Sequence, residues 1–280
     1  MTEKRAREFE FTDEDFERIR TFVSEHTGIV LTVAKKDMVY GRLSKRIRKG
    51  GFGDFSAFCD AIDNGDEEQQ DFLINAITTN LTAFFRENHH FEYLAEQVIP
   101  ELVKLKGSNR RLRIWSAGCS TGEEPYSIAI TLKEALPNFS QWDVKILATD
   151  LDANVVDHGK QGIYSAERIE GLSPERTQRW FKRGRGDKSH LVKVKPELQD
   201  MISFKRLNLL HPWPMQGTFD LMFCRNVVIY FDKDTQRVLF DRYAKMLVPN
   251  AHLFIGHSES LYKVSTDFDS LGKTIYRKNH

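Results

Sequence analysis

Residues 112–125 read LRIWSAGCSTGEEP, and this stretch decides the fold. Its first four residues predict a β-strand, the small residues after Trp115 predict a tight turn, and Pro125 stands in the first turn of a predicted helix. A strand, a turn and a helix in this order are typical of a parallel sheet covered by helices. Ligands of such sheets bind beyond the carboxyl ends of the strands, so the turn is the first candidate for a binding site.

The spacing of the turn, Gly118-x-x-x-Gly122, does not match the G-x-G-x-x-G pattern of dinucleotide-binding sheets. Glu123 and Glu124 follow at once and would repel a pyrophosphate at this helix start. A cationic or zwitterionic ligand with ribose hydroxyls fits this turn better. A glycine-containing connection without a ligand is the alternative.

The sequence on either side completes the domain plan. Further strands are predicted at residues 144–148, 201–207, 219–224 and 252–255, with helices at 151–161 and 234–246 between them. Residues at about 164–200 interrupt this alternation with a helical run and an alternating stretch typical of a β-hairpin. The first 90 residues show helical spacing only. We therefore predict an all-α domain over 1–90, then a doubly wound, Rossmann-like α/β domain over 91–280 that carries a small antiparallel β-subdomain.

Composition narrows the class of protein. The 280 residues carry 41 Lys and Arg against 40 Asp and Glu, so the net charge of +1 selects neither nucleic acid nor membrane. Three cysteines are too few and too scattered for a disulfide framework or a zinc site. The charged N-terminus excludes a secretory signal, and no apolar run reaches the roughly 18 residues of a membrane span. These observations predict a cytoplasmic protein.

Polar side chains stand at the ends of the next strands. Asp150 occupies the place where nucleoside-binding sheets put a carboxylate on the ribose hydroxyls, although a helix N-cap is an equal alternative. Asn208 ends the following strand, and Asn226-Val227 ends the one after it. Together these positions indicate a site for S-adenosylmethionine (AdoMet) rather than for a nicotinamide.

A further candidate segment, residues 78–87, precedes the sheet domain. It reads TTNLTAFFRE and is interpreted either as a helix end packed by its two phenylalanines or as a lid. As a lid, Asn80 and Thr82 offer hydrogen bonds, and Arg86 offers a fork for a carboxylate.

These segments resemble the CheR-type chemotaxis receptor methyltransferases. The resemblance rests on TTNLTAFFRE, WSAGCSTGEEPYS, ATDLD, FCRNVVIYFD and GHSE, and it spans nearly the whole chain. It implies an enzyme, a protein-glutamate O-methyltransferase, that uses AdoMet to form glutamyl methyl esters and S-adenosylhomocysteine during chemotactic adaptation. The AdoMet-contacting positions that it implies are Asn80, Thr82, Arg86, Glu124, Asp150, Asn208, Leu209, Asn226 and Val227. Arg86 is the candidate catalytic residue, as the holder of either the AdoMet carboxylate or the incoming glutamate.

The sequence lacks the residues that other methyl-transfer or metal-dependent chemistries need. The segment after the fourth strand has no proline of the kind that amino-methylating enzymes place there, and Cys224 lies in an apolar strand as a structural thiol. The histidines show no metal-ligand spacing, so no metal is expected. A carboxylate nucleophile fits this absence of a catalytic base, because glutamate is already ionised at neutral pH.

Two segments are candidates for partner binding. Arg42, Lys45, Arg46 and Lys49 lie on one face of a predicted helix at about 36–50, which is interpreted as a solvated face, an RNA-binding patch or a protein contact. The resemblance implies a contact with the acidic coiled coil of the receptor. Gly184-Arg185-Gly186 in the inserted subdomain is similar to family members that also bind a pentapeptide at the receptor C-terminus; an ordinary turn is the alternative. We expect a monomer that binds no nucleic acid.

Two other functions remain open at this point. A non-catalytic receptor-binding adaptor would keep the fold without binding AdoMet, and an RNA methyltransferase would use the basic helix on a nucleic acid, with steep salt dependence.

Overall fold

The computed structural model describes residues 7–279, which form two compact units. One unit holds the described residues up to Thr79 together with Tyr230–Asp232, and the other holds Asn80–Ile229 and the described residues from Lys233 onward. The division therefore falls earlier than the boundary expected at residue 90. No helix in the described part of the chain has the length and apolar character needed to cross a bilayer.

The first unit is helical, as the sequence predicts. It contains α1 (Asp13–Thr27), α2 (Lys36–Gly50), α3 (Phe55–Asp63) and α4 (Glu67–Ile77). Thr12 and Asp15 form a reciprocal capping box at the start of α1, although Asp replaces the usual Glu. The helical spacing of apolar residues reflects burial, since Val39, Leu43 and Ile47 of α2 are fully buried in the core of this unit.

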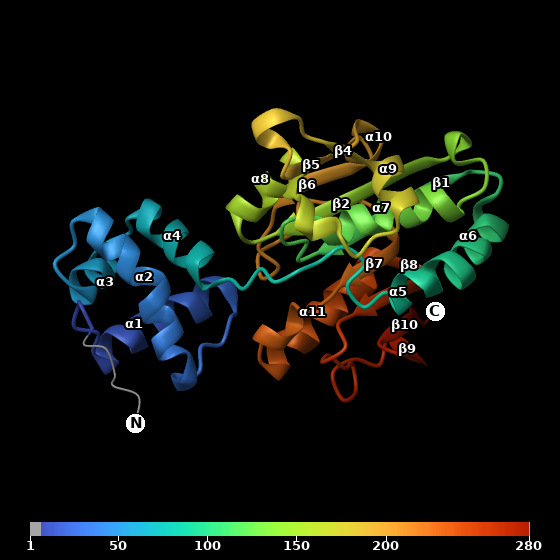
Figure 1. Cartoon of the computed structure of the whole chain (residues 1–280). Helices are drawn as coiled ribbons and strands as arrows, with labels where there is room; N and C mark the ends of the chain where they lie inside the picture. The colour runs from blue at the N-terminus through green and yellow to red at the C-terminus, as the bar shows by residue number, and fades with distance from the viewer. Residues whose placement is uncertain (1–6, 280) are drawn as a thin grey trace, which may run out of the picture. The chain divides into compact units, whose positions relative to one another are not determined.

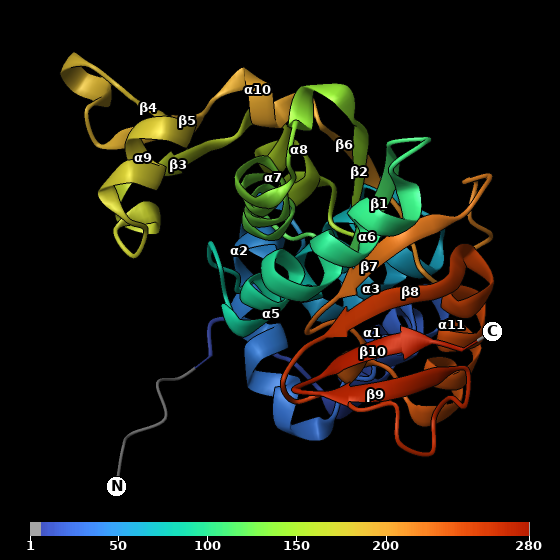
Figure 2. The same ribbon diagram turned by 90° about the vertical axis from the view of Figure 1, so that its right-hand side faces the viewer.

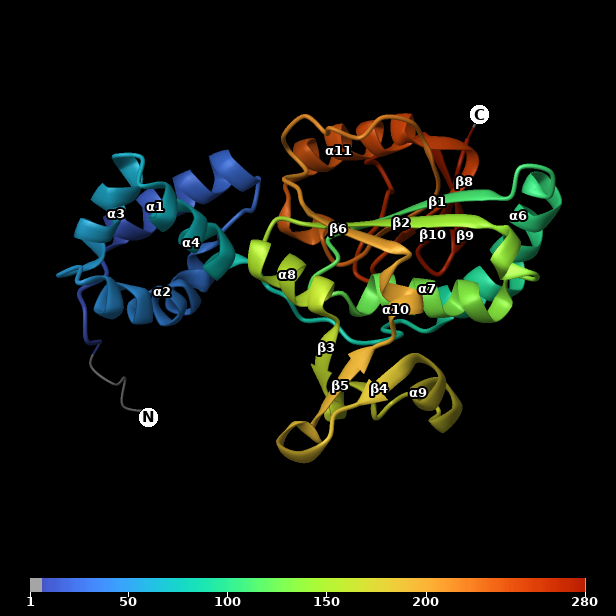
Figure 3. The same cartoon turned by 90° about the horizontal axis from the view of Figure 1, so that it is seen from above.

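The second unit is built on a sheet. Within residues 7–279 its seven strands lie in the order β6-β2-β1-β7-β8-β10-β9. Their bounds are β1 (Arg111–Ala117), β2 (Asp143–Asp150), β6 (Ile202–Arg206), β7 (Phe219–Cys224), β8 (Leu247–Ile255), β9 (Phe268–Gly272) and β10 (Ile275–Lys278). Helices α7 (Glu123–Ala135) and α11 (Lys233–Met246) lie on opposite sides of this sheet (Figure 3), and α8 (Ala153–Gln161) connects β2 to the inserted subdomain. The doubly wound fold is thus confirmed.

The expected parallel sheet carries an antiparallel addition at one side. The neighbouring strands from β6 to β8 pair in parallel, but β10 pairs antiparallel with both β8 and β9. Figure 2 shows these last strands beside β8. Neither was predicted, because β10 is four residues long and only Phe268 of β9 is buried. Before β1 the second unit also contains α5 (His89–Tyr93) and α6 (Ile99–Lys106), which a π-helical turn over Leu94–Val98 joins.

The predicted insertion is a small antiparallel sheet. Its strands β3 (Ile163–Ser165), β5 (Leu191–Val194) and β4 (Phe181–Arg183) lie in that order, with α9 (Pro174–Trp180) and α10 (Pro196–Gln199) beside them. Its two ends meet, because the Gln199 side-chain amide donates to the carbonyls of Lys160 at 3.3 Å and Gln161 at 3.1 Å. Trp180 Nε1 donates to Glu134 Oε1 of α7 at 2.8 Å and fixes the insertion to the larger domain. Figures 2 and 3 show this subdomain apart from the seven-stranded sheet, with which it overlaps in the view of Figure 1.

Candidate functional site

The turn after β1 is drawn tightly against its neighbours. The N–H groups of Gly118 and Cys119 donate to the Thr149 carbonyl at 2.8 and 2.9 Å. Gly118 has φ +83°, and a Cβ atom there would lie 2.2 Å from Val227 Cγ2. Glycine is therefore required at this position, both for its backbone conformation and for the close approach. The turn and Val227, far apart in sequence, share one edge of the sheet.

Asp150 ends β2 directly beside this turn. Its Oδ2 atom accepts from Ser120 N at 2.8 Å, and its Oδ1 atom accepts from Asp152 N at 3.1 Å. Burial raises the pKa of Asp150 from its ordinary 3.8 to about 6, against the lowering effect of these backbone hydrogen bonds. The N-cap of α8 is Asp152, which accepts from Asn154 N at 2.9 Å. The capping alternative for Asp150 is therefore wrong.

The segment 78–87 reaches the same edge. Asn80 Nδ2 donates to Asp152 Oδ2 at 2.8 Å, and the Asn80 carbonyl accepts from Ser120 Oγ at 2.9 Å. Thr82 is half-buried, and Arg86 Nη1 donates to the Leu81 carbonyl at 2.7 Å. Phe84 and Phe85 are buried in the core of the sheet domain, as the packed interpretation expects, and the lid stays a prediction.

Glu124 is buried in the first turn of α7. Its Oε1 atom accepts from Ser116 Oγ at 2.7 Å, and its Oε2 atom accepts from Arg225 Nη1 at 3.2 Å. Burial raises the pKa of Glu124, and the Arg225 charge opposes this shift. A carboxylate so placed gives the site a negative charge close to the glycine-containing turn.

Arg225 joins this carboxylate to the segment 78–87. Besides Glu124, it lies 3.3 Å from Glu87 Oε2 and donates to the Arg86 carbonyl. Glu87 Oε1 in turn lies 2.8 Å from His257 Nδ1. Burial disfavours the charged form of Glu87, but the His257 hydrogen bond and the Arg225 charge prevail and hold its pKa at about 2. Arg225 is itself buried, so its charge is balanced by these two carboxylates.

Sequence reasoning missed Arg225, Glu87 and Asp152, and it missed Glu259, a buried carboxylate after β8 that accepts hydrogen bonds from the loop after β7. A signal for Arg225 is present, because an arginine directly after the buried strand β7 needs a buried anion as partner. The signal for the other three depends on the fold, which brings distant loops together.

The loops after β6 and β7 hold the remaining candidates. Asn208 Oδ1 accepts from Leu210 N at 3.0 Å, and the carbonyl of buried Leu209 accepts from Arg242 Nη1 of α11 at 2.7 Å. Asn226 adopts a left-handed backbone conformation with φ +58°, next to Val227.

This donor and acceptor set fits AdoMet. Each Asp150 oxygen accepts one backbone hydrogen bond, which leaves lone pairs for ribose hydroxyls. The carboxylates of Glu124 and Asp150 suit a cationic sulfonium ligand, and the amides at 80, 208 and 226 supply both donors and acceptors. No group of three or more His, Cys, Asp or Glu side chains suited to a metal ion occurs among residues 7–279.

Two cations of the basic helix α2 bond to groups within the helical unit itself. Arg42 Nη1 donates to the carbonyls of the last two residues of α4 at 3.0 and 2.9 Å and to that of the C-cap Thr78 at 2.7 Å. Arg46 pairs with Glu68 at 2.5 Å. Lys45 and Lys49 are exposed, and neither has an ion-pair partner among the described residues. The face available to a partner is thus narrower than the charge pattern suggests.

The Gly184-Arg185-Gly186 turn follows β4, an edge strand of the inserted sheet. Gly184 is required, because a Cβ atom there would lie 2.0 Å from the Lys188 carbonyl oxygen. Gly186 has φ +57°, and Arg185 is exposed. The turn is therefore tightly built and presents a cation beside a strand edge.

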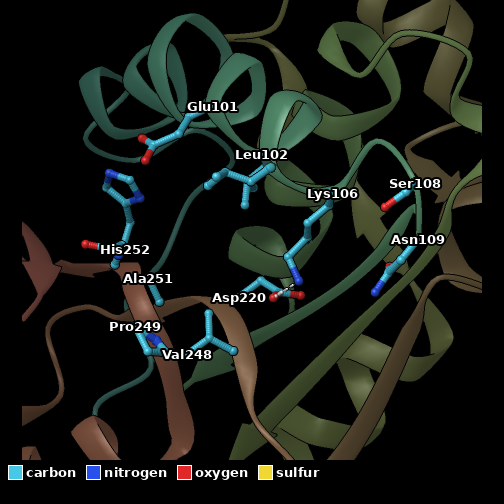
Figure 4. A pocket seen from close by; sticks show the side chains of 12 residues that line it. Glu101, Leu102, Lys106, Ser108, Asn109, Asp220, Val248, Pro249, Ala251 and His252 are labelled. Carbon is cyan, nitrogen blue, oxygen red and sulfur yellow. Dashed lines mark ion pairs between the residues drawn. The ribbon is translucent and has the colours of Figure 1, made fainter. Parts of the chain in front are cut away.

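A separate cavity of about 290 Å³ lies at the amino ends of β1 and β7 (Figure 4). Its charged side chains are compensated within the chain: Lys106 lies 2.5 Å from Asp220, and Glu101 lies 2.6 Å from Arg277. The strand ends that carry the candidate residues lie at the opposite edge of the sheet, so we assign no chemistry to this cavity.

Comparison with known proteins agrees with this geometry. Residues 80–277 match the family model described as "CheR methyltransferase, SAM binding domain", and residues 14–78 match "CheR methyltransferase, all-alpha domain". Chemotaxis protein methyltransferase 2 of Pseudomonas aeruginosa is 46% identical over 270 residues, which cover 96% of this chain and 94% of that protein. The chemotaxis protein methyltransferases of Salmonella typhimurium and Escherichia coli are 42% and 41% identical. Those two alignments each cover 99% of this chain, and 92% and 93% of the relatives.

Proposed function

This chain belongs to the CheR methyltransferase family, and from that membership we propose that it transfers the methyl group of AdoMet to glutamate side chains of chemotaxis receptors. AdoMet-dependent methylation in chemotactic adaptation is the activity of the family, and the glutamate acceptor is the proposal. The observation that carries it is the meeting of Asn80, Glu124 and Asp150 beyond the carboxyl ends of the parallel strands.

The chain's own residues bind and orient in this proposal. When bound, AdoMet supplies an electrophilic methyl group on its sulfonium. Asp150 accepts hydrogen bonds from the ribose hydroxyls, and Glu124 places negative charge near the sulfonium cation. Arg86 holds the carboxylate either of AdoMet or of the incoming glutamate. Buried His90 is too weak a base to assist, because burial lowers its pKa to about 3. A glutamate acceptor needs none, since its carboxylate is ionised at neutral pH and requires only alignment.

The test is methyl transfer from methyl-labelled AdoMet to receptor fragments. We expect label that is released as methanol by mild base, because glutamyl esters hydrolyse under conditions that leave N-methyl groups intact. The Asp150→Ala variant serves as the matched control and should transfer little label at low AdoMet. Label that resists base would contradict a glutamate acceptor, and a folded chain that binds no AdoMet would favour the adaptor function.

We also propose two receptor contacts. Lys45 and Lys49 are exposed cations suited to an acidic coiled coil, and the edge of β4 offers backbone groups to an added peptide strand. Arg185 lies next to that edge, where it can pair with a terminal carboxylate. Calorimetry with a receptor C-terminal peptide should show binding to the wild-type chain and none after deletion of residues 184–186. Absence of binding to the wild type would restrict receptor contact to the coiled coil.

The receptor portion in this proposal is cytoplasmic, and we therefore place the enzyme in the cytoplasm. We also propose that the enzyme is a monomer. Light scattering at enzyme concentrations near those of the assay checks the oligomeric state.

A further inference from the structure

We infer that Glu259 is a positioning residue that holds the loop at 226–229 in its binding conformation before AdoMet arrives. The inference rests on the proposed function, because it assigns this loop, through Asn226 and Val227, to the cofactor site.

Glu259 gathers backbone donors from two loops. Its Oε1 atom accepts from the N–H groups of Val227 at 2.8 Å, Val228 at 2.9 Å and Ile229 at 3.3 Å. Its Oε2 atom accepts from Asn226 N at 3.0 Å and from Gly256 N at 2.5 Å. One carboxylate therefore satisfies every backbone N–H of the 226–229 loop.

The sheet brings these loops together. Strands β7 and β8 are parallel neighbours, and their last residues, Cys224 and Ile255, lie directly opposite each other. The chain after β8 turns so that Glu259 points back across this edge, toward the loop that leaves β7. The carboxylate thus links the ends of two adjacent strands.

The loop needs such a partner. Asn226 is held at φ +58°, in the left-handed region that asparagine adopts more readily than most residues other than glycine. Gly256 permits the close approach, since a Cβ atom there would lie 2.3 Å from Asn226 Nδ2. Without the carboxylate, four neighbouring N–H groups would lose their acceptor, and the loop would lose the contact that fixes its conformation.

The charge of Glu259 is stabilised by backbone dipoles. The side chain is only 5% exposed, and burial raises its pKa while the backbone hydrogen bonds oppose that shift. No basic side chain pairs with it within residues 7–279. An amide is therefore a poor substitute, because its NH₂ group would face donors rather than acceptors.

The experiment compares Glu259→Gln with wild type by calorimetric titration of AdoMet. We expect affinity to fall about tenfold or more, and the KM for AdoMet to rise in parallel while the KM for the receptor stays unchanged. Glu101→Gln is the matched control, because it makes the same chemical change in an ion-paired carboxylate at the opposite edge of the sheet. Circular dichroism verifies that each variant is folded.

Amide hydrogen exchange supplies a second measurement that needs no variant. If Glu259 pre-forms the loop, the amides at 226–229 are protected in wild type without AdoMet. Protection that appears only after AdoMet is added would overturn the inference, as would a folded Glu259→Gln variant that binds AdoMet normally. A wild type that binds no AdoMet but shows protected amides would instead refute the proposed function.

Discussion

Acidification should weaken AdoMet binding through Asp150. The carboxyl ends β2 beside the glycine-containing turn, and burial raises its pKa to about 6. An ionised carboxylate accepts hydrogen bonds from ribose hydroxyls and attracts the sulfonium cation, whereas the protonated form has lost its charge and one acceptor site.

The magnitude follows from the titration. With a pKa of about 6, roughly nine tenths of Asp150 is ionised at about pH 7 and roughly one tenth at about pH 5. If only the ionised form binds, the apparent Kd is the intrinsic Kd divided by that fraction. The Kd should therefore rise about tenfold between these two pH values.

Calorimetric titration of wild type and Asp150→Asn across this range tests the reasoning. The variant should bind more weakly at neutral pH and lose the pH-dependent component that Asp150 contributes. Because burial also raises the pKa of Glu124, some slope remains in both proteins, and the difference between them is the quantity to compare. Identical slopes in the two proteins would refute the assignment.

The same shift has the opposite effect on stability without ligand. The pKa of Asp150 is higher in the folded chain than its ordinary value of 3.8, so the folded state binds a proton more readily. This group's contribution to the free energy of unfolding should therefore increase as pH falls through about 6 toward about 4, by up to about 3 kcal/mol. Denaturant titration of wild type and of Asp150→Asn measures this contribution, and a contribution of opposite sign would show that desolvation does not raise the pKa of Asp150.

Three more predictions follow from the contacts. The double substitution Lys45→Glu and Lys49→Glu should raise the receptor KM and leave the AdoMet Kd unchanged; normal receptor methylation would show that these cations are only solvated. Arg225→Met leaves two buried carboxylates without their cationic partner. It should lower the free energy of unfolding by about 3–5 kcal/mol in denaturant titration and should also lower AdoMet affinity. A loss of stability below about 1 kcal/mol would argue against a buried ionic cluster. Gly118→Ala should displace Val227 and lower thermal stability and AdoMet affinity, and a variant indistinguishable from wild type in both would contradict the close approach.

The sheet domain was predictable where the spacing of apolar residues in the sequence matches the face that is buried. Residues 112–125 show β-type and helical spacing in succession, and the strand, the turn and α7 lie where that spacing predicts. Strands β3 and β10 were missed because three or four residues carry too little alternation to be recognised. Tertiary pairing, rather than local pattern, makes them strands.

The site shows the same division. Asp150 is a candidate because of its place at a strand end, and the structure places it beside the turn, where its role in binding a ligand stays a prediction. Arg42 illustrates what sequence conceals: at helical spacing with other cations it resembles a binding face, yet it satisfies the terminal carbonyls of α4. Only the packing of two helices distinguishes a capping arginine from an exposed one.

The meeting of the two ends of the inserted subdomain has an evolutionary consequence. Because Gln199 bonds back to Lys160 and Gln161, the chain leaves α8 and returns toward β6 at nearly one place. An insertion with adjoining ends can lengthen, shorten or be exchanged as a cassette without altering the loops of its host. If the module binds a peptide as proposed, that function can change through residues of the insertion alone, without a change in the sheet that carries it.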